Sequence, residues 1–234
     1  MNIFLLTGQS NMAGRGPLET VEPIRHPNLL VLREEGWEEA IEPLHRDKES
    51  AGIGLAMSFS QRLLERSPQA VIGLVPCAEG GSPLSRWMPG QDLSERAVGL
   101  GRRALEDGEL RGILWHQGES DSGTKSDASS YGPRLTKVIA HLREQLDATD
   151  VPFISGEVGS FLREVEGKTY FSVVNDALRA TAESVALYAC ASSHDLPDKG
   201  DHIHFDAPAL REFGNRYAEE YLTLIQTHHL PPLS

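Results

Sequence analysis

The sequence predicts a single α/β domain, residues 1–234, built on a five-stranded parallel sheet with helices on both faces. Two observations predict this class. Short apolar, β-rich runs recur along the chain, and each is followed by turn residues and then by a segment of helical periodicity. The chain has 234 residues, 39% of them hydrophobic, which is enough for one substantial core.

The predicted strands are buried runs without polar alternation, as expected in a covered parallel sheet. They cover residues 2–6, 70–75, 111–115, 152–155 and 185–190, and the predicted helices cover 50–66, 93–106, 131–147, 170–184 and 208–226. Pro68 and Gly108 follow the first two helices and account for their ends. Residues 14–49 break the alternation, and we expect them to cross the sheet edge with a small hairpin around Val31 and Trp37.

The charge balance limits the possible partners. The chain has 22 Lys and Arg against 34 Asp and Glu, a formal charge of −12, which disfavours nucleic acids and anionic membranes and favours neutral or weakly charged substrates. No apolar stretch reaches the ~18 residues of a membrane span. The first residues lack the charged leader and cleavage site of a signal peptide, so we expect a cytoplasmic protein, or a secreted one whose leader has been removed.

The loop after the first strand contains a serine that could act as a nucleophile. Gly8 permits a tight turn there, and Ser10 would open a short helix. The hydroxyl of Ser10 would then lie at the carboxyl edge of the sheet, and its own unpaired N–H could donate to an oxyanion. Ser10 could equally be a helix N-cap. Met12 stands where an α/β-hydrolase nucleophile elbow has glycine, so a different scaffold is indicated.

A serine nucleophile needs a base, and the base needs an orienting group. Of the nine histidines, we select His204, because Asp201 lies three residues before it and a single turn would bring the carboxylate to its Nδ1–H. Nε2 would then face Ser10. Asp201 could instead cap the following helix, and His204 could be a solvated loop residue. We expect His202 to point elsewhere.

Two further loops offer donors for an oxyanion. Gly80 and Gly81 follow the second strand and could present a backbone N–H, while Gln117 follows the third strand and could present its side-chain amide. Trp37, Arg86 and Trp87 lie in irregular or loop segments and are candidates for sugar contact, although a lone tryptophan more often packs in the interior.

These motifs together resemble the sialate O-acetylesterase-like group of SGNH hydrolases, which includes carbohydrate esterase family 6. The matching segments are Gly-Gln-Ser-Asn-Met at 8–12, Pro-Cys-Ala-Glu-Gly-Gly at 76–81 with Trp87 after it, Trp-His-Gln-Gly-Glu-Ser-Asp at 115–121 and Asp-His-Ile-His at 201–204. The element Gln-Gly-Glu-Ser-Asp is the most specific of them. The resemblance extends from residue 3 to about residue 222.

The resemblance implies a flavodoxin-like three-layer α/β/α fold and a serine esterase that removes O-acetyl groups from carbohydrates, such as acetylated xylan or acetylated sialic acid. It places the nucleophile at Ser10, the acid and base at Asp201 and His204, and the oxyanion donors at the Ser10 N–H, at Gly80 or Gly81 with Gly80 preferred, and at Gln117. Glu119 either anchors the nucleophile loop or competes with Asp201 as the partner of His204. No cofactor is implied.

Two other functions remain open from the sequence. His202 and His204, with Asp201, Asp206 and His194 as further candidate ligands, could bind zinc in a metal-dependent hydrolase. Alternatively, the loop after the first strand could hold a flavin phosphate or a sugar in a flavodoxin-like binding module.

Overall fold

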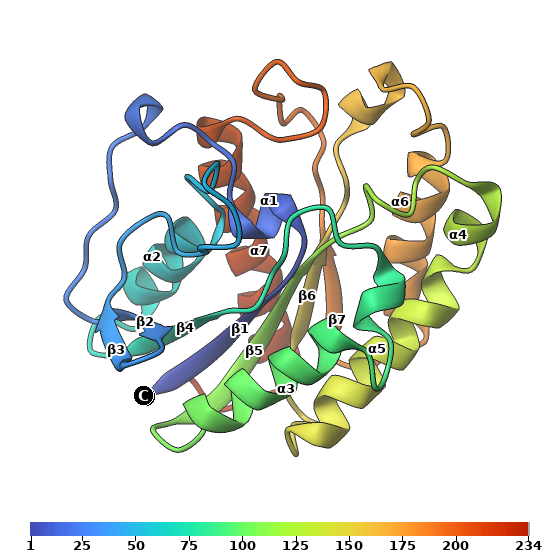
Figure 1. The fold of residues 1–234 in the computed structure, drawn as a ribbon. Coiled ribbons are helices and arrows are strands. Elements are labelled where there is room, and N and C mark those ends of the chain that lie inside the picture. Colours follow the sequence, from blue (N-terminus) through green and yellow to red (C-terminus); the bar gives the residue numbers. More distant parts are fainter. Residues whose placement is uncertain (234) are drawn as a thin grey trace.

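The computed structural model describes residues 1–233, in which a seven-stranded sheet lies between two layers of helices (Figure 1). The strands are β1 Asn2–Gly8, β2 Leu29–Arg33, β3 Gly36–Glu39, β4 Ile72–Pro76, β5 Glu109–His116, β6 Phe153–Gly156 and β7 Tyr188–Ala191. The α-helices are α1 Ser10–Ala13, α2 Ala56–Arg66, α3 Asp92–Ala104, α4 Lys125–Ser129, α5 Tyr131–Gln145, α6 Phe171–Ala180 and α7 Ala207–Thr227. Short 3-10 turns cover Leu18–Thr20, Leu84–Trp87, Ser160–Glu164 and Thr181–Glu183.

The strand order is β3-β2-β4-β1-β5-β6-β7, and every neighbouring pair is parallel except β2 and β3. The five predicted strands, β1, β4, β5, β6 and β7, therefore lie in the order 2-1-3-4-5, which is the flavodoxin-like arrangement. This confirms the predicted three-layer α/β/α fold.

The predicted strand count of five was too low. The hairpin expected around Val31 and Trp37 exists, but it joins the sheet, because β2 pairs in parallel with β4 and thereby extends the edge. The first long helix also begins later than predicted, at Ala56. Gly52 and Ile53 before it hydrogen-bond in extended form to Gly14 and Gly16, so these residues cannot join the helix.

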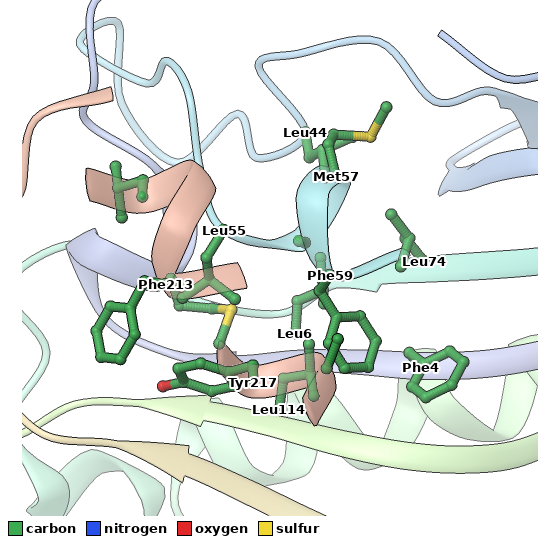
Figure 2. Packing of buried hydrophobic residues seen from close by; sticks show 14 of the residues in the cluster. Phe4, Leu6, Leu44, Leu55, Met57, Phe59, Leu74, Leu114, Phe213 and Tyr217 are labelled. Atoms are coloured by element: carbon green, nitrogen blue, oxygen red, sulfur yellow. The ribbon is translucent and has the colours of Figure 1, made fainter. Parts of the chain in front are cut away.

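Alternate side chains of β1 pack into two separate hydrophobic cores, one on each face of the sheet. Phe4 and Leu6 point to the face covered by α2 and α7, where Phe4 packs edge-on against Phe59 at 5.2 Å between ring centroids (Figure 2). Ile3 and Leu5 point to the opposite face, which α3, α5 and α6 cover. Fully burying each such side chain contributes roughly 1.5 to 3 kcal/mol, so β1 is held firmly in the centre of the sheet.

Candidate active site

The turn after β1 depends on a glycine at position 8. Gly8 has a φ of 119°, and a Cβ there would lie 2.1 Å from the carbonyl oxygen of His116 on the neighbouring strand β5. Only glycine fits this close approach. The chain therefore turns sharply at the carboxyl end of β1, and Ser10 begins α1 at that edge of the sheet.

Ser10 lies next to His204, which in turn lies next to Asp201. His204 Nε2 is 3.0 Å from Ser10 Oγ, and His204 Nδ1 is 2.7 Å from Asp201 Oδ2. The backbone N–H groups of Ile203 and His204 donate to Asp201 Oδ1 at 3.0 and 2.8 Å, so one turn folds the carboxylate back onto the imidazole. Asp206, rather than Asp201, caps α7, by accepting the N–H of Ala209 at 2.7 Å.

The contacts of Asp201 keep its carboxyl group ionised. Partial burial acts to raise the pKa of Asp201, but hydrogen bonds from the imidazole and backbone of His204 and from the backbone of Ile203 outweigh it. The pKa consequently lies well below its ordinary value. A carboxylate in this position fixes the Nδ1–H tautomer of His204 and leaves Nε2 free to accept the proton of Ser10.

Glu119 anchors α1, and within residues 1–233 it has no hydrogen bond or ion pair with His204. Its Oε1 accepts from Asn11 Nδ2 at 2.5 Å and lies 3.4 Å from His116 Nε2. Burial acts to raise the pKa of Glu119, but the contacts with His116 and Asn11 outweigh it and leave the pKa below its ordinary value. Of the two roles open to Glu119 from the sequence, the geometry therefore supports the anchor.

The two glycines after β4 differ in whether their N–H groups are available. The N–H of Gly80 donates to Asp47 Oδ2 at 2.8 Å, and Asp47 is also paired with the buried Arg15 at 2.6 Å. Within residues 1–233, the N–H of Gly81 has no acceptor, and neither has that of Ser10. The preference for Gly80 was therefore misplaced, and the geometry favours Gly81.

Gln117 does not present its amide to the site. Its side chain is fully buried, and Nε2 lies within hydrogen-bond distance of three acceptors, which are Asp121 Oδ2 at 2.7 Å, the Ser82 carbonyl at 3.1 Å and Gln9 Oε1 at 3.2 Å. Its oxygen accepts from Tyr131 at 2.9 Å. Because an amide nitrogen has only two hydrogens, none is left for an oxyanion, and the expected donor role disagrees with this geometry.

A cavity of about 340 Å³ opens in front of Ser10 and His204. Its walls include both of these residues, the two glycines and Glu119, and they carry four basic side chains, which are Arg15, Lys48, Lys168 and Lys199. The sequence reasoning missed these basic residues, because they come from separate irregular loops and form no motif. Gln9 was also missed, although it lines the cavity beside Ser10 and its Oε1 accepts from the Ser120 N–H at 3.3 Å.

The residues proposed for sugar contact lie elsewhere. Trp87 is fully buried and packs edge-on against Trp115 at 5.2 Å between ring centroids. Trp37 lies on the edge strand β3 and donates to Asp107. Arg86 is paired with Glu79 and Asp92. None of the three lines the cavity at Ser10.

His202 lies 3.4 Å from Asp198 and does not line the cavity at Ser10. In the described part of the chain, no three His, Cys, Asp or Glu side chains are grouped closely enough to hold a metal ion. No helix among residues 1–233 is long and apolar enough to cross a membrane.

The three-layer fold is the one that SGNH hydrolases have, and solved structures of low sequence identity to the chain share it. The chain aligns over 95% of its length with a GDSL-like lipase from Parabacteroides merdae (14% identity, 95% of that chain, TM-score 0.62). It aligns over 96% with a carbohydrate acetylesterase from Xanthomonas citri (18% identity, 57% of that chain, TM-score 0.72).

The particular family follows from closer matches. Residues 1–223 match the family described as carbohydrate esterase, sialic acid-specific acetylesterase, and the chain belongs to this family. A probable carbohydrate esterase of Arabidopsis thaliana is 36% identical, and the alignment covers 94% of this chain and 90% of that protein. A solved Arabidopsis thaliana structure is 34% identical with a TM-score of 0.87, over 95% of this chain and 98% of that one. The chain is therefore an esterase.

Proposed function

We propose that the protein removes O-acetyl groups from carbohydrates by a two-step transfer through Ser10. His204 takes the proton of Ser10 as Oγ attacks the acetyl carbonyl, and then gives it to the departing sugar oxygen as the carbon–oxygen ester bond breaks. Water, deprotonated by His204, releases acetate from the acetyl-enzyme and restores Ser10. The proposal depends on the alignment of Ser10, His204 and Asp201, of which Ser10 and His204 line one cavity.

The free backbone N–H groups support the same chemistry. Each tetrahedral intermediate has a negatively charged oxygen, which needs donors that are already in place. The N–H groups of Ser10 and Gly81 both border the cavity and have no acceptor within the described chain, so they are the proposed oxyanion donors.

The basic residues of the cavity favour an acidic sugar over a neutral one. The ammonium group of Lys168 donates to the Glu119 carbonyl at 2.7 Å, a neutral acceptor that leaves its charge uncompensated. The ammonium group of Lys48 has no hydrogen-bond or ion-pair partner among residues 1–233. In a protein with a formal charge of −12, this local positive charge would attract a carboxylate. We therefore propose acetylated sialic acids, rather than acetylated xylan, as the substrate type.

The nucleophile is tested with Ser10→Ala and with Ser60→Ala as a matched control. Ser60 is also buried, but its hydroxyl donates to the Ala56 carbonyl inside α2. We expect Ser10→Ala to lose nearly all turnover of p-nitrophenyl acetate and all labelling by a fluorophosphonate, while Ser60→Ala keeps both. Full activity in Ser10→Ala, or loss of wild-type activity with EDTA, would contradict the mechanism.

The substrate type is tested by acetate release from acetylated sialic acid and from acetylated xylo-oligosaccharides. Replacing Lys48 or Lys168 with Met should raise KM several-fold for the acidic sugar and leave KM for the neutral one unchanged. Added salt should have the same selective effect, because it screens exposed charges. Equal changes in KM for both substrates would count against an acidic sugar as the substrate.

A further inference from the structure

Asn11 directly follows the proposed nucleophile, yet its side chain does not serve its own helix. Asn11 is fully buried within α1, and its amide contacts the loop that carries His204, at a separation of 192 to 194 residues along the chain. The hydrogen bond from this amide to Glu119 anchors α1, but neither that bond nor the proposed acyl transfer accounts for the two contacts with the His204 loop. Its contacts therefore need a separate explanation.

The two ends of the amide hold the two peptide groups that flank His204. Asn11 Oδ1 accepts the N–H of Phe205 at 3.2 Å, and Asn11 Nδ2 donates to the carbonyl of Ile203 at 3.1 Å. The second hydrogen of Nδ2 goes to Glu119 Oε1. This set of partners fixes which end is oxygen and which is nitrogen, since only the nitrogen can donate to a carboxylate and a carbonyl.

Glu119 fixes the orientation of the Asn11 amide by accepting a hydrogen bond from Nδ2. Besides Asn11, its Oε1 contacts His116, whose Nδ1 lies 3.0 Å from the hydroxyl of Tyr217 on α7. Tyr217 in turn donates to the Trp115 carbonyl on β5 at 2.8 Å. All four side chains, those of Asn11, Glu119, His116 and Tyr217, are 2% exposed or less, so water does not compete for these contacts.

We propose that Asn11 is a positioning residue that clamps the backbone on both sides of His204 and thereby holds Nε2 at hydrogen-bond distance from Ser10, with Glu119 holding Asn11. The inference depends on the proposed function, because it assigns Asn11 a task only if His204 serves Ser10. His204 lies on a loop whose side chains at 201 and 202 are exposed, so an anchor is needed. A displacement of about 1 Å between reacting groups can reduce the rate by roughly 100-fold.

The test compares Asn11→Ala with Asn175→Ala. Asn175 is a matched control, because it is also a buried asparagine whose amide holds both polar groups of one backbone residue, Val158, at 2.8 and 2.9 Å. It does not line the cavity. We expect both variants to lower the melting temperature, but only Asn11→Ala to lower kcat for p-nitrophenyl acetate, by about 10- to 100-fold, with KM within twofold of wild type.

The rate of fluorophosphonate labelling of Ser10 should fall in parallel with kcat, because both reactions need His204 in place. Unchanged kcat and labelling in Asn11→Ala, or an equal loss in Asn175→Ala, would overturn the positioning role. Asn11→Asp, which keeps the side-chain volume, replaces Asn11→Ala if the latter does not fold, and the same loss is expected. Full activity in His204→Ala would instead overturn the proposed function, whatever Asn11 does.

Discussion

His204 Nε2 lies 3.0 Å from Ser10 Oγ, although the two residues are 194 positions apart in the chain. The contact forms because β1 lies at the centre of the sheet and the loop before α7 returns across its carboxyl edge (Figure 1). Parallel strands present their carboxyl ends at one edge, so loops that are distant in sequence meet there.

Asp201→Asn should reduce kcat for p-nitrophenyl acetate by about 10²- to 10⁴-fold, because an amide can no longer fix the tautomer of His204. The pKa of Asp201 is lowered, so the carboxylate is ionised throughout pH 5 to 8, and wild type should exceed the variant in kcat across this range. The ionised form stabilises the fold above the ordinary pKa of ~3.9, and that contribution is lost as the pH falls towards the lowered value. A variant whose kcat at pH 7 lies within tenfold of wild type would contradict this role of Asp201.

Gln117→Ala should affect stability more than catalysis. The variant removes one buried donor from Asp121, which keeps the N–H of Leu84, and one from the Ser82 carbonyl, and this should lower the free energy of unfolding by about 1 to 3 kcal/mol. If Gln117 were an oxyanion donor, kcat would fall by about 10²- to 10³-fold. We expect kcat to fall less than tenfold. Urea unfolding of the same preparation gives the change in stability.

Asp47→Ala should be strongly destabilising, by about 3 to 5 kcal/mol, because it leaves Arg15 buried without its partner. The side chains of this pair are 4% and 6% exposed, whereas the pair of Arg62 and Glu65 is 36% and 53% exposed. Glu65→Ala is therefore the control and should cost less than about 1 kcal/mol. If urea unfolding shows similar losses of unfolding free energy in Asp47→Ala and Glu65→Ala, then burial of the pair of Arg15 and Asp47 has no special effect.

His45 should make the protein sensitive to acid. Burial lowers its pKa to about 4, and its Nε2 accepts the N–H of Ala78 at 3.2 Å. The unfolded chain takes up this proton near pH ~6.5, so the free energy of unfolding should fall by roughly 3 kcal/mol as the pH drops from 6.5 to 4. His45→Gln should remove much of this fall, and the exposed His228→Gln should not. Identical pH profiles for wild type and His45→Gln, measured by urea unfolding, would contradict the assignment.

Much of the fold could be predicted because its signals are local. The apolar runs at 2–6 and 152–155 predict strands by length and composition alone, and the turn from Asp201 to His204 spans only three residues. The pairing of β2 with β4 at the sheet edge joins residues far apart in the chain, such as Leu29 and Ile72. Local sequence signals therefore did not predict it.

The sequence by itself determined the layered α/β fold and brought forward Ser10, Asp201 and His204 as a set. Only the tertiary structure decided which donors remain available to a substrate. The sequence suggests that the Gly80 N–H and the Gln117 amide are free to bind an oxyanion. In the structure the Gly80 N–H donates to Asp47 and the Gln117 amide donates to Ser82, and each acceptor is more than 30 residues away in the chain. The physical reason is that a buried polar group must find a partner wherever the fold provides one, and that partner is set by packing rather than by spacing.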